Sequence, residues 1–318
     1  MEVPQELRDF RNFLYIAWEH LNLPDPTPIQ YDIAEYIQHG PKRRVVQAFR
    51  GVGKSWITSA FVVHQLLLDP TKNILVVSAS KQRADDFSTF TLRLITDMPI
   101  LRHLIPTESQ RNSKVAFDVG PAPASHAPSV VSKGITSQIT GARADLIIAD
   151  DVESMNNSQT QMMRDKLSEA IKEFDAVLKP NGAILFLGTP QTEGSIYSAL
   201  PERGFKTRIW PARYPKAAQL PQYGDQLSPK IVTEVQEDEE LATQPTDPKR
   251  FDADDLMERE ASYGRTGFAL QFMLDPSMSD IDRYPLKLAD LVIMSLNHRE
   301  GPQKPAWASA ADNVLQDL

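Results

Sequence analysis

The octapeptide AFRGVGKS at 48–55 constrains this sequence more than any other feature. A β-rich apolar run, VVQAF, leads into it, and a long apolar helical pattern, WITSAFVVHQLLLD, follows it. A phosphate-binding loop reads G-x-x-x-x-G-K-[ST] between a strand and a helix. Gly53, Lys54 and Ser55 match that pattern, whereas Ala48 stands where the first glycine is usual. The strand-loop-helix context therefore predicts a nucleotide site in an α/β fold.

The residue types in this loop suit the binding of a nucleoside triphosphate. Backbone N–H groups at a helix N-terminus surround phosphate oxygens, and glycine lets the backbone approach them closely. Lys54 is expected to neutralise the β- and γ-phosphates, and Ser55 to hold Mg²⁺. A glycine turn with a chance lysine is the structural alternative. The loop residues expected to bind nucleotide are Arg50, Gly51, Val52, Gly53, Lys54, Ser55 and Trp56.

A second motif, DLIIADDVE at 145–153, ends an apolar strand pattern in carboxylates. Asp150 is expected to bind Mg²⁺ through water. A carboxylate directly after it can polarise the attacking water, which needs a base within hydrogen-bond reach. Asp151 occupies that position, and Glu153 is its rival. Taken alone, the motif is equally consistent with a solvated turn, but together with the phosphate loop it predicts a catalytic pair.

Three weaker features agree with a nucleotide site. Gln30, in the run TPIQ, can read an adenine edge, although helix caps share this pattern. Thr189 follows the apolar run AILFLG, where a hydroxyl can sense the γ-phosphate and a simple strand-to-loop turn is the alternative. Arg50 and Arg143 flank the two motifs, and a guanidinium near a γ-phosphate can stabilise transition-state charge. Each arginine is equally consistent with a surface charge.

Apolar runs rich in β-branched residues alternate with helical patterns over 1–212. Near-continuous apolar strands separated by helices indicate a parallel sheet covered on both faces. The predicted strands are 45–49, 73–80, 145–150 and 183–189, with shorter candidates at 115–119 and 129–133, and the predicted helices are 6–22, 29–38, 56–69, 81–98 and 159–178.

The sequence after Ala212 changes in character. A proline-rich segment leads into an acidic stretch, Val232–Glu260, and a helical run follows at 256–274. The acidic stretch holds 11 acidic and 3 basic side chains, a balance equal to the net charge of −8 of the whole chain. Because this stretch lies outside the nucleotide motifs, the overall acidity does not argue against a DNA partner. The run EDEE at 237–240 is interpreted as a solvated helix face rather than a metal site.

Several function classes are excluded or disfavoured. The absence of cysteine excludes disulfides, thiolate metal sites and cysteine nucleophiles. No H-E-x-x-H or G-x-S-x-G pattern is present, so neither zinc nor serine hydrolase chemistry is expected. The chain shows no signal peptide and no apolar window long enough to span a membrane, so we expect a soluble protein without a membrane partner. His64, on the apolar helix after the loop, is expected to pack in the core.

Together these motifs resemble the large terminase subunits of phages, most closely those of short-tailed phages of the podovirus type. The resemblance rests on AFRGVGKS with its arginine beside the glycine, on TPIQ, on GITSQITGARADLIIADD and on LFLGTP, and it covers 1–275. It implies an additional-strand, RecA-like P-loop ATPase with a small helical linker subdomain. It also implies an ATP- and Mg²⁺-dependent motor that moves double-stranded DNA into the prohead in the host cell cytoplasm. The implied partners are the portal protein, the small terminase subunit and further copies of the chain in a ring, with five as the expected number.

The resemblance also implies roles in binding and hydrolysis. On the family template Gln30 reads adenine, and Asp150 completes the metal site begun by Ser55. Aspartate follows Asp150 where many relatives carry glutamate. The identity of the base therefore stays open between Asp151 and Glu153.

Three further roles concern the transmission of hydrolysis. The resemblance implies that Thr189 couples hydrolysis to motion and that Arg50 acts within its own subunit. Arg143 is the candidate finger that reaches the nucleotide of a neighbouring subunit.

The expected organisation is an ATPase core at 1–212, an acidic linker or lid subdomain at 213–275 and a connection at 276–318. In the resembling family a nuclease with a carboxylate cluster follows. The late aspartates of this sequence lie on no strand pattern that could gather them, so we expect ATPase without nuclease; they are Asp280, Asp282, Asp290, Asp312 and Asp317.

Two alternative functions stay open. TPIQ with a phosphate loop also begins superfamily-two helicases and remodelling ATPases. Those proteins need a second motor domain, and no alternating pattern follows Ala212 to build one. A non-hydrolysing assembly module would use the loop only structurally, and the carboxylate pair argues against that function.

Overall fold

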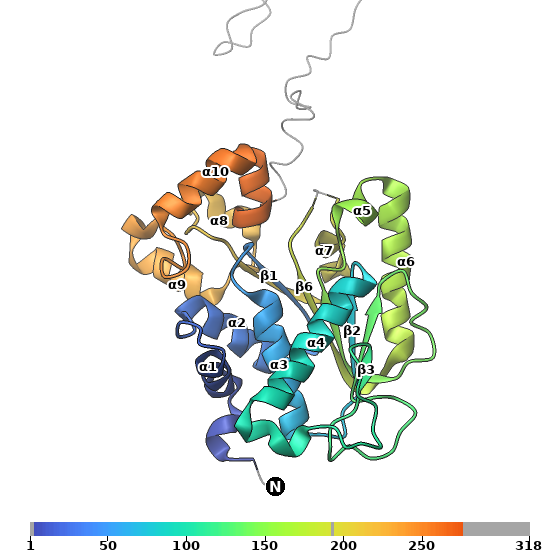
Figure 1. Cartoon of the computed structure of the whole chain (residues 1–318). Helices are drawn as coiled ribbons and strands as arrows, with labels where there is room; N and C mark the ends of the chain where they lie inside the picture. Colours follow the sequence, from blue (N-terminus) through green and yellow to red (C-terminus); the bar gives the residue numbers. More distant parts are fainter. Residues whose placement is uncertain (1–2, 192–193, 276–318) are drawn as a thin grey trace, which may run out of the picture. The chain divides into compact units, whose positions relative to one another are not determined.

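The described residues form one sheet of seven strands, β1 (Arg43–Ala48), β2 (Ile74–Ser78), β3 (Ala116–Phe117), β4 (Val130–Gly134), β5 (Ala144–Asp150), β6 (Leu178–Gly188) and β7 (Lys206–Trp210) (Figure 1). Their order in the sheet is β3-β4-β2-β5-β6-β1-β7. Neighbouring strands run parallel except β3, which pairs antiparallel with β4. The structure, a computed structural model, describes residues 3–191 and 194–275, all within one unit of the chain.

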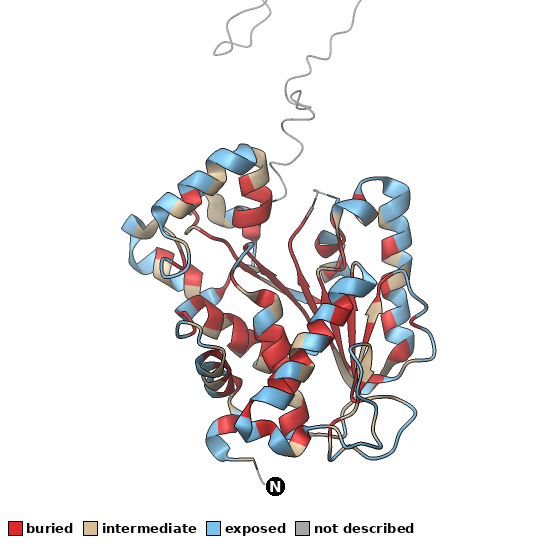
Figure 2. Ribbon diagram, viewed as in Figure 1, coloured by how far each residue is buried: buried red, intermediate tan, exposed pale blue. Residues whose placement is uncertain are grey.

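Helices cover both faces of this sheet. The α-helices of the described residues are α1 (Phe10–His20), α2 (Pro28–His39), α3 (Lys54–Leu68), α4 (Lys81–Asp97), α5 (Met155–Ser158), α6 (Gln161–Val177), α7 (Ile196–Ala199), α8 (Leu220–Tyr223), α9 (Pro229–Glu237) and α10 (Ala253–Phe268). Alternate strand residues point to opposite sides: Val46 and Leu187 join a core cluster with α1–α4, whereas Val45 and Phe186 join one with α6 and α7. Figure 2 shows buried strands between helices whose outer sides are exposed. The predicted parallel α/β sheet covered on both faces is confirmed.

Strand β6 lies between β1 and β5. Gln47 near the end of β1 is in register with Gly188, and Leu187 is in register with Asp150 of β5. The carboxyl ends of these three strands therefore meet at one edge, which is where open parallel sheets place their ligands. A strand inserted between the phosphate-loop strand and the carboxylate strand is the additional-strand arrangement that the resemblance implied.

Local sequence explains how the two helices at this edge begin. Before α2, the Thr27 hydroxyl accepts from the Gln30 N–H over 3.3 Å, and the Gln30 side chain accepts from the Thr27 N–H over 3.1 Å. This capping box, with Pro28 in the first turn, fixes the start of α2. Before α3, Gly53 adopts a φ of 94° that lets the loop turn directly into the helix at Lys54.

The segment after Ala212 packs against the same core as α1–α4. Tyr214, Ile231, Leu256 and Phe272 are buried members of that core cluster. This packing explains why the described part of the segment lies in one unit with the sheet. The expected three-part division at 212 and 275 stays a prediction.

The helical run predicted at 256–274 is not one regular helix. Gly264 has a φ of 69° inside α10, where it kinks the helix, and the run ends in a π-helical turn, Ala269–Met273. Glycine populates this φ region without the steric penalty of a side chain, which explains the break. The predicted helical run is therefore α-helical as far as Phe268, apart from the kink at Gly264. Its last residues form a π-helical turn instead.

Strand β7 was not predicted. It pairs with one edge of β1, and only Ile209 and Trp210 among its five residues are buried. Lys206 and Arg208 interrupt the apolar pattern that identified the other strands. A short edge strand with charged side chains therefore escapes a search for apolar runs.

Two smaller predictions are confirmed. His64 is fully buried, with its ring centroid 5.3 Å from that of Phe10 and 5.5 Å from that of Phe13. Residues 237–240 are exposed where α9 ends. Within 3–191 and 194–275 no helix is long and apolar enough to cross a membrane. The expected connection at 276–318 and the late aspartates lie outside the described residues.

Candidate nucleotide-binding site

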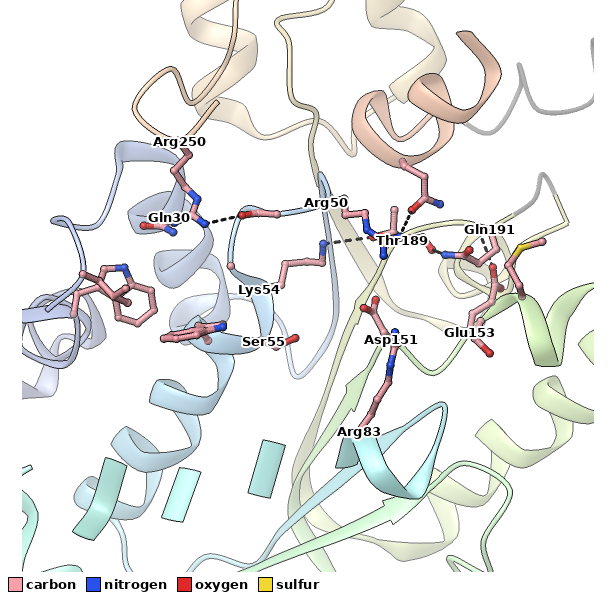
Figure 3. A pocket seen from close by; sticks show the side chains of 18 residues that line it. Gln30, Arg50, Lys54, Ser55, Arg83, Asp151, Glu153, Thr189, Gln191 and Arg250 are labelled. Carbon is pink, nitrogen blue, oxygen red and sulfur yellow. Dashed lines mark hydrogen bonds between the residues drawn. The ribbon is translucent and has the colours of Figure 1, made fainter. Parts of the chain in front are cut away.

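A cavity of about 620 Å³ lies at the carboxyl ends of β1, β5 and β6 (Figure 3). The phosphate loop, the residues after β5 and the loop after β6 supply most of its wall. The predicted site residues that line it are Gln30, Arg50, Gly51, Gly53, Lys54, Ser55, Trp56, Asp151, Glu153 and Thr189. Asp150 is buried and does not line the cavity itself, but it accepts a hydrogen bond from Ser55, which does.

The two loop glycines are required by the backbone. Gly51 and Gly53 both have a φ of 94°, a region that side chains rarely tolerate. A Cβ atom at position 51 would also lie 2.6 Å from the Phe251 ring, and one at position 53 would lie 3.3 Å from the Gln30 amide. These glycines lead into the N-terminus of α3, whose first N–H groups have no partner within the helix and can receive phosphate.

Lys54 is buried at the centre of the loop. Its ammonium donates to the Ala48 carbonyl over 2.6 Å and to the Thr189 hydroxyl over 3.4 Å. Burial lowers the pKa of Lys54, while the nearby charges of Asp151 and Asp150 raise it. A desolvated ammonium of this kind gains most from a strong anion, so the geometry suits a phosphate ligand.

Ser55 and Asp150 come together from α3 and β5. The Ser55 hydroxyl donates to both carboxylate oxygens of Asp150, over 3.0 and 3.1 Å. Burial, and then the neighbouring charge of Asp151, raise the pKa of Asp150 to about 7. The ionised form of Asp150 is therefore energetically costly, and a bound cation would stabilise it. Mg²⁺ is usually bound by one or two protein oxygen ligands together with water and phosphate oxygens, so the hydroxyl and carboxylate fit it.

Asp151 points into the cavity with a strained backbone. Its φ is 45°, in the left-handed region, and its N–H donates to the Leu187 carbonyl of β6 over 2.9 Å. Figure 3 shows the Asp151 carboxylate directed toward Lys54 and Thr189. Strain held by the surrounding structure is common at functional sites, and here it aims an acidic side chain into the cavity.

Glu153 has a different environment from Asp151. It is 2% exposed, and one carboxylate oxygen accepts from the Gln191 N–H over 2.9 Å. The other oxygen accepts from the Ser195 hydroxyl over 2.9 Å and from the Ile196 N–H over 2.7 Å. Both oxygens therefore hold the loop after β6 and the start of α7, rather than facing the cavity without partners.

Gln271, in the π-helical turn, joins the phosphate loop to the loop after β6. Its backbone carbonyl accepts from the Arg50 N–H over 3.1 Å, and its side-chain oxygen accepts from the Arg50 guanidinium over 3.3 Å. Its side-chain nitrogen donates to the Pro190 carbonyl over 3.1 Å. Pro190 directly follows Thr189, so one buried side chain positions two of the predicted functional residues.

Gln30 lies on another side of the cavity. Its side-chain nitrogen donates to the Val52 carbonyl over 2.8 Å, and its oxygen belongs to the cap of α2. Val52 itself is buried and does not line the cavity. Trp56 is 45% exposed and stands against Phe90, with ring centroids 4.9 Å apart. Gln30 and Trp56 thus present an amide and an aromatic face to the same cavity.

Arg143 is not brought to this cavity. It directly precedes β5, so it lies at the amino end of the strand whose carboxyl end carries Asp150. Its side chain is exposed and donates to the Ala142 carbonyl over 2.8 Å. Within one subunit, Arg143 therefore lies at the opposite edge of the sheet from the predicted nucleotide.

Five polar residues of the cavity lining were not predicted: Arg83, Ser154, Gln191, Arg250 and Gln271. Arg83 follows β2, whose carboxyl end lies at the same edge, and this position was the available signal. Arg250 comes from the acidic stretch and donates to the Gly51 carbonyl over 2.8 Å. The acidic stretch lies outside the nucleotide motifs in the sequence, as expected, but in the folded chain Arg250 of this stretch contacts the phosphate loop.

A phosphate loop, a carboxylate strand and a strand inserted between them define an additional-strand P-loop nucleotide-binding protein. The large terminase subunit of Enterobacteria phage T3 is 48% identical to this chain over 322 residues, a match that covers 99% of this chain and 55% of that protein. The chain is therefore a homologue of a phage large terminase subunit, which confirms the resemblance found in the motifs. It spans about half the length of this curated relative. No family model matches the chain.

Solved structures of terminases show a more distant likeness. The ATPase domain of the Thermus phage P74-26 large terminase is 15% identical, with a TM-score of 0.44 over 81% of this chain and 96% of that one. The HK97 bacteriophage large terminase is 14% identical, with a TM-score of 0.45 over 77% and 50%. Because both TM-scores are below 0.5, the fold is assigned from the sheet order and the loop geometry.

Proposed function

We propose that this chain is the ATP-hydrolysing motor subunit of a phage terminase, which drives double-stranded DNA into the prohead. The observation that carries the ATPase proposal is the convergence of Lys54, Ser55, Asp150 and Asp151 where β1, β5 and β6 end. The identity of 48% to the phage T3 large terminase subunit supports the packaging role.

The cavity offers separate groups to each part of Mg²⁺-ATP. Lys54 would exchange the Ala48 carbonyl for phosphate oxygens, beside the N–H groups at the start of α3. Ser55 and Asp150 would hold Mg²⁺, which supplies positive charge to the phosphates. Gln30 and Trp56 are the candidates for contact with the base.

We assign the base to Asp151. Its carboxylate lines the cavity and would accept the proton of the attacking water. Glu153 is the weaker candidate because its two oxygens already accept three hydrogen bonds from the loop after β6 and α7. We therefore propose that Glu153 positions this loop while Asp151 acts on water.

Charge on the transferred phosphoryl group needs cationic neighbours. Arg50 and Arg83 both line the cavity, Arg50 from the phosphate loop and Arg83 from the first turn of α4. Thr189 contacts the Lys54 ammonium at 3.4 Å and is followed by the loop that Glu153 and Gln271 hold. We propose that this contact transmits a change in the phosphates bound at Lys54 to the loop after β6.

ATP turnover tests the proposal. Purified wild-type protein and Lys54→Ala are compared for phosphate release with Mg²⁺-ATP, in the absence and presence of double-stranded DNA. Lys216→Ala removes an exposed lysine elsewhere and serves as the matched control. We expect hydrolysis by the wild type and the control, and its loss in Lys54→Ala; equal rates in all three would overturn the enzyme assignment.

The arrangement of Arg143 supports action between subunits. It directly precedes β5 and stands seven positions before Asp150 at the other end of that strand, roughly 23 Å away at the rise of an extended strand. We propose that the chain works in a homo-oligomeric ring, with five subunits expected, in which Arg143 faces a neighbour's nucleotide. Mixing Arg143→Ala with Lys54→Ala subunits should restore part of the activity. No recovery in mixtures shown to form rings contradicts action in trans.

The same proposal covers the partners and the place of action. A packaging motor would engage the portal protein of the prohead and the small terminase subunit in the host cell cytoplasm. The helicase alternative predicts separation of DNA strands, whereas a packaging motor predicts movement of an intact duplex. An assay of duplex unwinding beside one of DNA protection by proheads distinguishes them.

A further inference from the structure

A second cavity, of about 470 Å³, lies where β1 and β5 begin. Its charged lining consists of Lys42, Arg44, Lys72 and Lys179 with Asp69 and Asp145. Asp145 and Asp150 stand near opposite ends of β5, roughly 15 Å apart at the rise of an extended strand. The second cavity is therefore separate from the nucleotide site.

Arg44 is the unusual residue of this cavity. It is 5% exposed, and its Nη1 donates to the Pro41 carbonyl over 2.9 Å. Its buried Nε has no hydrogen-bond partner among the described residues. Burial lowers the pKa of Arg44 to about 10, and the opposing influence is the Tyr36 phenol rather than a carboxylate. Arg44 is therefore a buried cation with no carboxylate ion pair among the residues that the structure describes.

The lysines of the cavity are mostly held by neutral groups. Lys42 donates to the Asn181 side chain over 3.3 Å, and Lys72 to the Gln65 side chain over 2.7 Å. Within 3–191 and 194–275, Lys179 is the only one of these lysines with a carboxylate partner, Asp145, at 2.9 Å. These contacts orient the three ammonium groups around the cavity. The partners of Lys42 and Lys72 are neutral, so these two ammonium groups keep their positive charge.

The two carboxylates of the cavity do not balance the positive charge of its lysines and Arg44. Asp145 also accepts from the Asn73 N–H over 2.8 Å, and Asp69 accepts from the Thr71 hydroxyl over 2.6 Å. Four cationic and two anionic side chains line the cavity, which leaves two positive charges. A buried guanidinium beside partly exposed ammonium groups suits a tetrahedral oxyanion, because its planar fork and their point charges both favour phosphate.

We propose that this cavity binds a phosphate group, carried either by a free phosphate compound or by the backbone of DNA. Both sources offer the same chemistry, two or more anionic oxygens that accept from Arg44 and from the lysines at the rim. The proposal does not depend on hydrolysis in the first cavity, since the two sites share no lining residue.

Calorimetric titration of the full chain tests this proposal. The probe is inorganic pyrophosphate at low ionic strength, with the first cavity saturated by Mg²⁺ and a non-hydrolysable ATP analogue. Arg44→Gln removes the buried cation. Because this change can also unfold the protein, the double variant Lys42→Gln/Lys72→Gln tests the rim separately. The matched control is Lys166→Gln/Lys216→Gln, which removes two exposed lysines elsewhere.

We expect one pyrophosphate site whose affinity falls about tenfold in the rim variant and changes less than about twofold in the control. Competition with a short DNA duplex identifies the backbone as the source, and pyrophosphate binding without competition identifies a free phosphate compound. Absence of saturable binding, or equal weakening in the rim variant and the control, would overturn the proposal.

Discussion

The Ser55 hydroxyl donates to the Asp150 carboxylate over 3.0 Å, joining the first turn of α3 to the end of β5. The two residues are 95 positions apart in the sequence, and β6 lies between β5 and β1, the strand that leads through the phosphate loop to α3. Their contact shows that the phosphate loop and the carboxylate strand form one site. Burial makes the negative charge of Asp150 costly without a cation, and the hydrogen bond from Ser55 offsets part of this cost.

Asp150→Asn is expected to separate catalysis from stability. Loss of the carboxylate should reduce Mg²⁺-dependent hydrolysis about 10²-fold or more, since the metal loses its charged ligand. The same change should raise the free energy of unfolding without ligand by roughly 1–3 kcal/mol, because burial raises the pKa of Asp150 and makes its ionised form costly. Phosphate release and urea denaturation measure the two effects. A variant that is less active and also less stable would contradict this account.

Asp151→Asn and Glu153→Gln are expected to differ in kind. Asp151→Asn should lower kcat by about 10²–10⁴-fold with little change in stability, as for loss of a general base. Glu153→Gln should mainly destabilise the protein, by about 1–3 kcal/mol, because its oxygens accept three buried hydrogen bonds. Steady-state kinetics and denaturation of both variants decide between them. The opposite pattern would identify Glu153 as the base.

Gln271→Ala is expected to slow turnover without weakening nucleotide binding. The side chain holds the Arg50 guanidinium and the Pro190 carbonyl, so we expect kcat to fall about tenfold and KM to change little. Gln271→Glu keeps the acceptor for Arg50 and loses the donor to Pro190, and should give an intermediate rate. Gln236→Ala, at an exposed position on α9, is the control. A rate for Gln271→Ala equal to this control would remove the positioning role.

His64 is expected to make stability depend on pH. Burial lowers its pKa to about 4 from the ordinary 6.5, so between these values the unfolded chain binds a proton that the folded chain does not. The free energy of unfolding should therefore fall as the pH drops through this window, by up to about 3 kcal/mol. In His64→Gln the loss between pH 7 and 5 should be about 2 kcal/mol smaller than in the wild type. Urea denaturation at both pH values measures it; identical losses would exclude His64 as the cause.

The central strands and the ends of β1 and β5 could be predicted from the sequence because their signals are local. Apolar runs identify buried strands, and AFRGVGKS and DLIIADD place charged groups directly after them. The role of Glu153 could not be predicted, since its partners Gln191, Ser195 and Ile196 lie about forty positions further on and meet it only in the folded chain. Local pattern therefore identified the candidates, and tertiary contact separated their roles.

The contributions of Arg250 and Gln271 escaped prediction for a related reason. Both lie in segments whose local pattern is that of a solvated acidic stretch or an ordinary helix. Only the packing of Phe251 against Gly51, and of the π-helical turn against Arg50, brings them to the cavity. A pattern search along one segment does not register contacts between segments more than 190 residues apart.

The packing of 247–251 on the phosphate loop matters for protein engineering. Asp247 accepts from the Thr27 hydroxyl over 2.8 Å, and Phe251 stands against Phe49 with ring centroids 5.8 Å apart. A chimera that borrows this nucleotide site therefore has to carry the chain at least through Gln271, which lines the cavity, even though the seven strands end at Trp210. A graft cut at the end of the sheet would leave the loop without one of its walls, and the smallest transplantable module is larger than the sheet that defines it.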